Sequence, residues 1–198
     1  MSTPVRALDG PPLVHELLAR RRSPRAIDPR RPVSRLAIRT LLEAARIAPS
    51  CFNEQPWRFL VFDAEDQEAL ERARSCLVDG NAWARRAPVL LLSVAAERWT
   101  DGTPNRHAQH DVGLASENLA LEATALGLAV HLMAGFDADR ARELFGIPDG
   151  FTPMAMIALG HPGTADDLPA TLREREHAPR RRKPIGEIAF DAHWGVGY

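Results

Sequence analysis

The run Val89-Leu90-Leu91-Leu92-Ser93-Val94 constrains the fold most, because apolar and polar residues do not alternate along it. A strand with one face in water does alternate, so this run predicts a strand that is covered on both faces. Further strands are predicted at residues 58–62, 129–133 and 154–159, with Gly160 closing the last one. A sheet that is covered on both faces needs helices on each side of it.

Apolar residues recur at helical spacing in five other segments. The predicted helices cover residues 11–22, 35–47, 65–77, 107–126 and 137–145. Ser34 and Asp137 are the expected N-caps of two of them. In the second helix the residues expected to be buried are Leu36, Ile38, Leu41, Leu42, Ala45 and Ile47. The helix at 107–126 has a broad apolar surface, which suits the centre of a core or a subunit interface.

Helices and strands alternate irregularly, with no internal repeat and no linker long enough to divide the chain. We therefore predict the α+β class, with a small mixed sheet wrapped by helices, as one domain over residues 1–198. The stretch at 162–198 is rich in Pro, Arg and Glu, and we expect it to form a C-terminal arm with little core of its own.

Composition narrows the function further. The chain is 45% hydrophobic and 26% charged, as soluble globular proteins are. Its net charge of −1 argues against a general nucleic-acid or membrane binder, and no apolar run approaches the roughly 20 residues that span a bilayer. The N-terminus lacks the pattern of a secretory signal, and two cysteines do not make a disulfide framework. We expect a cytoplasmic protein.

Arginines cluster near both ends of the chain, and Lys183 is the only lysine. One cluster comprises Arg20, Arg21, Arg22 and Arg25, and the other Arg180, Arg181 and Arg182. Guanidinium groups hold phosphate through paired, charged hydrogen bonds, so the two clusters could meet at one phosphate. A solvated basic turn and a basic tail are the alternatives, and a GC-rich coding bias also explains the preference for arginine.

The segment at 48–57, APSCFNEQPW, is the most specific local signal. Two prolines stiffen its backbone and leave Ser50, Asn53 and Gln55 as hydrogen-bonding side chains. Such a loop suits recognition of a planar heterocycle, and an ordinary helix-to-strand connection is the alternative. Cys51 has no obvious histidine partner in the sequence, so we expect a packed small residue rather than a nucleophile.

Other candidate features are weaker. Gly135 follows an apolar strand, where its backbone N–H could approach a ligand; an ordinary turn glycine is the alternative. His107, His110 and Asp111 lie near one face of a helix, but no HExxH pattern or paired cysteines accompany them, so we expect no metal site. The sequence has no GxSxG, P-loop or GxGxxG pattern, which argues against a Rossmann dinucleotide domain.

Taken in this order and spacing, these segments resemble the nitroreductase family of flavoenzymes. Residues 21–25 are similar to the family's RRSxR opening, and residues 48–59 to its APSxxNxQPWRF. The helix at 107–126, followed by Gly127-Leu128, resembles the family's dimer-core helix. Ile157-Ala158-Leu159-Gly160 and Arg182-Lys183-Pro184 complete the match. Cys51 and Phe52 stand where the family often has small or polar residues.

The resemblance implies an FMN-dependent oxidoreductase, with two FMN sites at the interface of an intertwined homodimer. Carried over by position, the residues at the phosphate and ribityl chain would be Arg21, Ser23 and Arg182, joined by Arg22 and Arg180. Arg25 would lie near the pyrimidine edge of the flavin, and the backbone of Ala134 and Gly135 would face its N5 side. The partner subunit would contribute Pro49, Ser50, Cys51, Asn53 and Gln55.

The implied reaction has two steps. NADH or NADPH donates hydride to FMN and leaves, and a small electrophilic acceptor such as a nitroaromatic or a quinone then takes the electrons. FMN performs the chemistry, so we expect no catalytic side chain. One alternative is a flavin-consuming enzyme that makes dimethylbenzimidazole, against which Asn53 before Gln55 argues. The others are a non-catalytic flavin or anion sensor and an arginine-rich interaction module.

Overall fold

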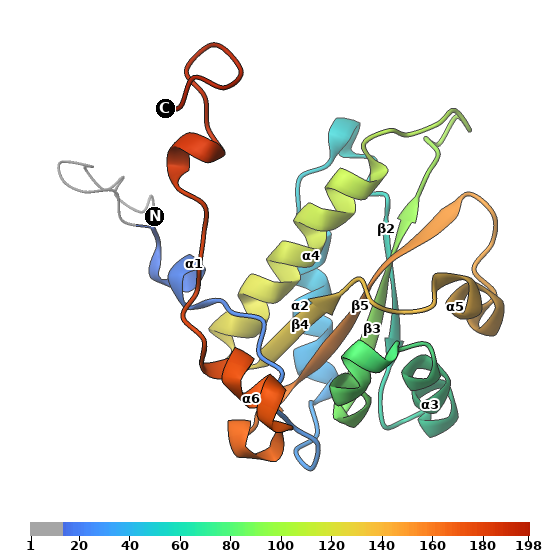
Figure 1. Ribbon diagram of the computed structural model, residues 1–198. Helices are drawn as coiled ribbons and strands as arrows, with labels where there is room; N and C mark the ends of the chain where they lie inside the picture. The colour runs from blue at the N-terminus through green and yellow to red at the C-terminus, as the bar shows by residue number, and fades with distance from the viewer. Residues whose placement is uncertain (1–13) are drawn as a thin grey trace, which may run out of the picture.

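The computed structural model describes residues 14–198 and is built on a five-stranded sheet (Figure 1). The strands are β1 (Ile27–Asp28), β2 (Trp57–Phe62), β3 (Val89–Ala96), β4 (Ala129–Met133) and β5 (Phe151–Pro162). β3 lies between β2 and β5, and β5 also pairs with β4 and with the short β1. Every pairing of the described strands is antiparallel. The α+β class is confirmed, but the prediction of a mixed sheet is wrong for this part of the chain.

β3 is buried on both faces, as its uninterrupted apolar run predicts. Val89 and Leu91 belong to one hydrophobic cluster, and Leu90 and Leu92 belong to a second cluster on the other face of the sheet. Because successive side chains of a strand point to opposite faces, each half of the run fills its own core. The apolar run is therefore explained by two cores that share one strand.

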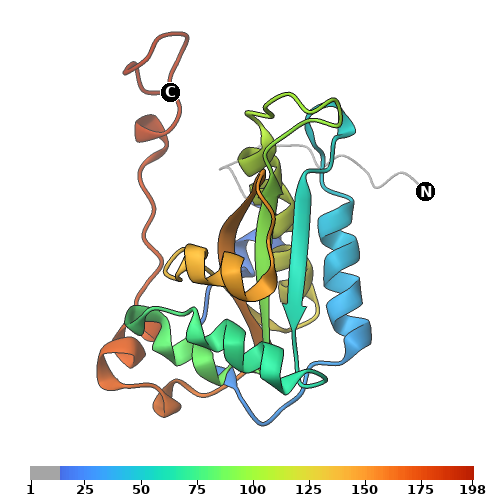
Figure 2. The same ribbon diagram turned by 90° about the vertical axis from the view of Figure 1, so that its right-hand side faces the viewer.

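Helices cover both faces of the sheet (Figure 2). The first cluster is completed by α2 (Arg35–Arg46) and α4 (Ala108–Ala125). The second is completed by α3 (Gln67–Ser75), α5 (Ala138–Phe145) and the 3₁₀ helix η2 (Asp79–Arg86). The predicted place of residues 107–126 in the core is confirmed, since one face of α4, including Ala115 and Leu119, is buried in the first cluster.

Two predicted helix caps are confirmed. The Ser34 side chain accepts a hydrogen bond from the Ala37 amide at the start of α2, and Asp137 accepts one from Arg140 at the start of α5. The predicted burial of α2 is partly wrong, because Leu36 is 75% and Ile47 70% exposed. Leu36 precedes the buried Ile38 by two residues, or about 200° around a helix, and so points away from the core.

Two element boundaries also differ from the prediction. The helix predicted at 11–22 is α1 (Glu16–Arg20), and its residues 11–13 lie outside the described part. Val14, just before this helix, and Leu18 within it are apolar but exposed in the single chain. The last strand does not end before Gly160, because this residue pairs with Ala129 of β4 and the strand continues to Pro162.

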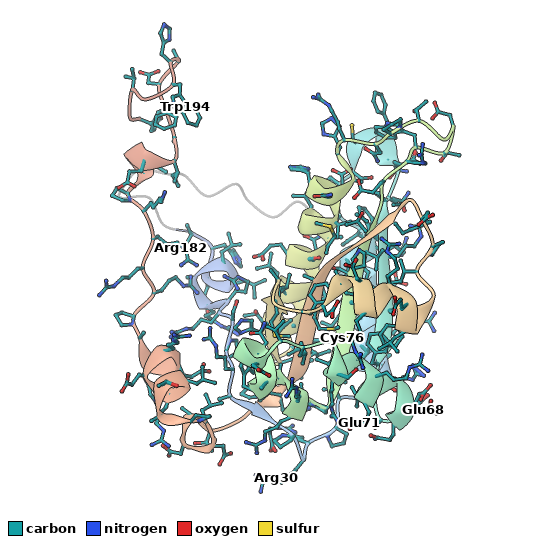
Figure 3. The ribbon with its side chains drawn as sticks, turned by 45° about the vertical axis from the view of Figure 1, so that its right-hand side comes forward. Arg30, Glu68, Glu71, Cys76, Arg182 and Trp194 are labelled. Atoms are coloured by element: carbon teal, nitrogen blue, oxygen red, sulfur yellow. The ribbon has the colours of Figure 1, made fainter. Side chains whose placement is uncertain are left out.

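Beyond β5 the chain forms an arm over residues 163–198. It contains α6 (Ala170–His177) and the short 3₁₀ helices η3 (Ala165–Asp167) and η4 (Ile185–Glu187). Its end extends away from the sheet, with Trp194 almost fully exposed near the tip (Figure 3). Of the arm's hydrophobic side chains, Leu168 alone is buried. None of the helices in residues 14–198 is both long enough and apolar enough to cross a membrane.

Candidate functional site: an arginine-lined recess

The two arginine clusters meet at one recess. It has a volume of about 310 Å³ and lies between the segment that joins α1 to β1 and the extended part of the arm beyond α6. Figure 3 shows the arm, with Arg182 labelled, running beside α1. The residues that line the recess are Arg21, Arg22, Ser23, Arg25, His131, Arg180 and Arg182. All six residues predicted for the phosphate and pyrimidine ends of FMN are thus close together.

Hydrogen bonds to main-chain carbonyls hold the arm against the N-terminal arginine cluster. Arg180 donates to the carbonyl of Arg21, and Arg22 donates to the carbonyl of Ala178 at 3.1 Å. A second bond from Arg22 reaches the carbonyl of Glu176 at 3.5 Å. The arm and the segment after α1 therefore form the recess together, and neither forms it alone.

The recess has more positive than negative charge. Arg21 forms an ion pair with the half-exposed Glu117 at 3.3 Å, and its guanidinium also lies 3.4 Å from the Ser23 hydroxyl. Among residues 14–198, the other arginines that line the recess have no carboxylate within salt-bridge distance. Partial desolvation and the charges of Arg182, Arg21 and Arg22 lower the pKa of Arg180. This arrangement favours an anion.

The ring of His131 lines the recess, and the ring of Trp83 packs against it from outside. His131 on β4 donates from Nδ1 to the Pro24 carbonyl at 3.1 Å, since a carbonyl oxygen can only accept. Its ring lies 4.8 Å from the ring of Trp83, and the Arg25 guanidinium lies 6.0 Å from the Trp83 ring centroid. Burial lowers the pKa of His131, so its ring is neutral at pH 7. These contacts fix the position of Pro24 and Arg25.

Ala134 and Gly135 follow β4, the strand that carries His131. The carbonyl of Gly135 accepts a hydrogen bond from the Asn81 side chain at 2.9 Å, and a Cβ on Gly135 would lie 2.6 Å from that same nitrogen. Packing against η2 therefore explains the glycine. Its amide has no acceptor among the described residues.

The loop at 49–56 has an unusual backbone. Phe52, Asn53 and Gln55 all have positive φ angles, which cost free energy in residues other than glycine. The Gln55 amide donates to the Ser50 hydroxyl, and the Cys51 amide donates to a carboxylate oxygen of Asp111, each at 3.0 Å. The loop that the sequence predicts to be stiff is thus held by hydrogen bonds in a strained conformation.

Asp111 is buried near the start of α4, where the sequence offered it only as a weak candidate metal ligand. One of its oxygens accepts from Cys51, and the other lies 3.1 Å from Nδ1 of His110. No group of three or more metal-ligating side chains occurs in the described part of the chain. Asp111 therefore anchors the loop to α4. Cys51 is half-buried, and its thiol is free.

One chain does not bring all the predicted site residues together. The loop is anchored at the N-terminal end of α4 through Asp111. The recess lies beside the rest of that helix, where Arg21 contacts Glu117 and Arg20 contacts the carbonyl of Thr124. In Figure 1 the loop is near the end of α4 that is farther from α6. The loop residues Pro49, Ser50, Cys51, Asn53 and Gln55 therefore form a second, separate group.

Sequence reasoning missed three residues that shape the recess: His131, Trp83 and Glu176. A histidine inside an apolar strand is a local signal, and it could have marked His131. Trp83 lies in a segment without a diagnostic pattern, and Glu176 lies in an arm where charged residues are frequent. Their contacts depend on how distant segments dock.

Residues 18–161 match the sequence profile of the nitroreductase family, so the chain belongs to this family and is an oxidoreductase. The chain is 30% identical over 200 residues to a Thermus thermophilus protein named NADH dehydrogenase, covering 80% of this chain and 86% of that protein.

Two solved structures are similar over most of the chain. One, described as the oxidoreductase containing FMN, has 35% identity and a TM-score of 0.87, with 99% of each chain covered. The other is a Desulfovibrio desulfuricans protein solved in complex with FMN. It has 26% identity and a TM-score of 0.70, with 90% of this chain and 96% of that chain covered. The regions that carry the sequence resemblance thus lie in a chain whose whole fold is that of the family.

Proposed function

We propose that the protein is an FMN-dependent oxidoreductase that passes electrons from NADH or NADPH to a small electrophilic acceptor, such as a nitroaromatic or a quinone. The observation that carries this proposal is the recess itself. Five arginines surround about 310 Å³, and only Arg21 among them has a carboxylate partner within the described part. A phosphate monoester supplies the missing negative charge, and the flavin mononucleotides named for the similar structures carry that group.

In this proposal Arg21, Ser23 and Arg182 hold the phosphate and the ribityl chain, with Arg22 and Arg180 beside them. Arg25 provides positive charge at the pyrimidine edge of the flavin, and the contact with Trp83 keeps its guanidinium in place. β4 leads from the phosphate end towards the backbone of Ala134 and the amide of Gly135. That amide lacks an acceptor among residues 14–198, which supports a role in binding the ring.

The second group of site residues, on the loop at 49–56, is proposed to come from a partner subunit. The loop lies at the other end of α4 from the recess, so a homodimer would let each copy complete the site of the other. Phe52 at the tip of the loop is 91% exposed, and Leu36 and Ile47 on and next to α2 are also exposed. Large apolar side chains left exposed by the single chain support a protein contact on this side of the molecule.

FMN, when bound, supplies the electron-transfer chemistry by taking up a hydride and passing electrons to the acceptor. The protein's own residues bind and orient it. Positive charge near the ring, here that of Arg25, favours its reduced anionic form. No side chain is assigned as a general acid or base. The cytoplasmic location stays a prediction from the sequence.

The test compares FMN with riboflavin, which lacks the phosphate. Purified protein should be yellow, release FMN and elute as a dimer. Arg182→Ala should weaken FMN binding about 10-fold to 100-fold, because a hydrogen bond to a charged group contributes about 1.5–3 kcal/mol. Riboflavin binding should be unchanged. Arg181→Ala is the matched control, because Arg181 does not line the recess.

Activity is measured as oxidation of NADH and NADPH with a nitroaromatic and with a quinone. A colourless protein that refuses added FMN would refute the proposal. Tight FMN binding without oxidation of either nicotinamide by any acceptor would favour the flavin sensor instead.

A further inference from the structure

One carboxylate of the arm contacts the segment between α1 and β1 directly. Glu176, in the last turn of α6, accepts hydrogen bonds from the amides of two consecutive residues. Its two oxygens lie 3.1 and 3.0 Å from the amide nitrogen of Arg25, and one of them lies 3.3 Å from that of Ala26. The side chain is partly buried, unlike its exposed neighbours Glu174 and Arg175.

This contact fixes the arm at the point where the arm turns towards the recess. Glu176 precedes Arg180 by four residues and Arg182 by six, and after His177, where α6 ends, this part of the chain has no regular secondary structure. The other hydrogen bonds between this stretch and the N-terminal arginine cluster are made by the side chains of Arg22 and Arg180, which are both exposed. The hydrogen bonds of Glu176 to two main-chain amides are therefore the partly buried attachment of a segment that is otherwise exposed.

We propose that Glu176 is a positioning residue for the phosphate end of the flavin: it latches the arm to the amides of Arg25 and Ala26, so that arm closure and phosphate binding are coupled. The proposal rests on the proposed function, because the phosphate is that of FMN. When the latch is closed, Arg180 and Arg182 face Arg21 and Ser23 across the recess. When it opens, the two arm arginines leave and the recess loses one side.

An effect of the Glu176 charge alone and a role of Glu176 in positioning the arm predict opposite changes in FMN affinity. Glu176 adds a negative charge close to the recess, where it repels a phosphate. If charge alone mattered, its removal would tighten FMN binding. If Glu176 positions the arm, its removal withdraws Arg180 and Arg182, and FMN binding weakens. The sign of the change therefore identifies the role.

The first experiment measures dissociation constants of FMN and riboflavin for the wild type, Glu176→Ala, Glu176→Gln and Glu174→Ala. We expect Glu176→Ala to weaken FMN binding about 10-fold to 100-fold, the effect of one or two lost charged hydrogen bonds. Glu176→Gln keeps one acceptor oxygen and should lose less. Glu174→Ala removes a charge from the same helix, and because the Glu174 side chain has no hydrogen bond or ion pair within residues 14–198, this variant should bind FMN as the wild type does. Riboflavin should bind all four proteins alike.

Unchanged or tighter FMN binding by Glu176→Ala would overturn the latch. Failure of the wild type to bind FMN would instead refute the proposed function, so the two failures are distinguishable. The circular dichroism spectrum and the melting temperature should be the same for all four proteins, which shows that the variants are folded.

The second experiment follows the arm itself by limited trypsin digestion, with cleavage after Arg180, Arg181 and Arg182 identified by mass spectrometry. Without ligand, Glu176→Ala should be cleaved at these bonds several-fold faster than the wild type and Glu174→Ala. Saturating FMN should protect the wild type, and riboflavin should not. Equal cleavage of the unliganded proteins would overturn the latch. Protection of Glu176→Ala should need a correspondingly higher FMN concentration than protection of the wild type. Protection of both proteins at the same FMN concentration would overturn the coupling.

Discussion

The buried carboxylate of Asp111 leads to a prediction that the structure makes quantitative. Asp111→Ala removes the acceptor of the Cys51 amide, and an unsatisfied buried donor costs about 1–3 kcal/mol. The loop that this bond restrains contains three residues with positive φ, each held against about 1–2 kcal/mol of backbone strain. Because Cys51 is only half-buried, we expect the free energy of unfolding to fall by about 2 kcal/mol.

The assay is thermal unfolding, together with FMN titration. For a chain of this size, a loss of about 2 kcal/mol lowers Tm by about 4–8 °C. FMN affinity should fall as well, because the proposed contribution of the loop to the partner subunit's site depends on its conformation.

Two variants serve as controls. Asp111→Asn keeps an oxygen that can accept from Cys51 and should lose less than half as much stability. His110→Ala removes only the exposed contact to Asp111 and should stay within about 0.5 kcal/mol of the wild type. The reasoning is refuted if Asp111→Ala melts with the wild type and binds FMN equally well.

Three further predictions follow from burial and close contacts. Gly160→Ala should lower the free energy of unfolding by about 1–3 kcal/mol, because the new Cβ would lie 2.4 Å from Ile27 Cγ2. The control Gly113→Ala on α4, whose Cβ would have nothing within 4 Å, should be neutral or stabilising, and equal melting temperatures of the two variants would contradict this. Burial lowers the pKa of His131, so as the pH falls the unfolded chain binds the proton before the folded protein does, and stability should fall below about pH 6.5. The Tm of His131→Gln should therefore depend less on pH between 7 and 5 than that of the wild type. If the two curves of Tm against pH are parallel, His131 is not the cause. In the protein freed of FMN, a thiol reagent should label Cys51 before Cys76, because Cys76 is buried and its burial raises the pKa of its thiol. The order is read by mass spectrometry of the labelled peptides, and earlier labelling of Cys76 would contradict the prediction.

The architecture could be predicted from local patterns because those patterns report burial. The run at 89–94 predicts a strand between two helical layers, and the structure has that arrangement. Errors arose where apolar character was taken as burial without regard to helical angle, as at Leu36. The direction of strand pairing was also beyond local pattern, because it depends on how the connections return to the sheet.

The site could be predicted in part for the same reason. Phosphate binding without a glycine-rich loop requires several cations, so charge indicated that the two arginine clusters could meet. The family resemblance singled out Arg21 and Arg182, and both line one recess. The latch by Glu176 could not be foreseen, because its partners are backbone amides that every residue carries. Nor does an aromatic residue such as Phe52 indicate a positive φ angle, which here depends on the anchor from Asp111.

The order of the segments along the chain has a consequence for biosynthesis. The last strand of the sheet ends at Pro162, whereas Arg180 and Arg182 follow later in the arm. During translation the sheet and its helices can therefore assemble before the arm side of the recess has been made. If the recess holds the FMN phosphate as proposed, a chain at that stage can have a native core and still be unable to retain the cofactor, so cofactor loading becomes one of the last events in its maturation.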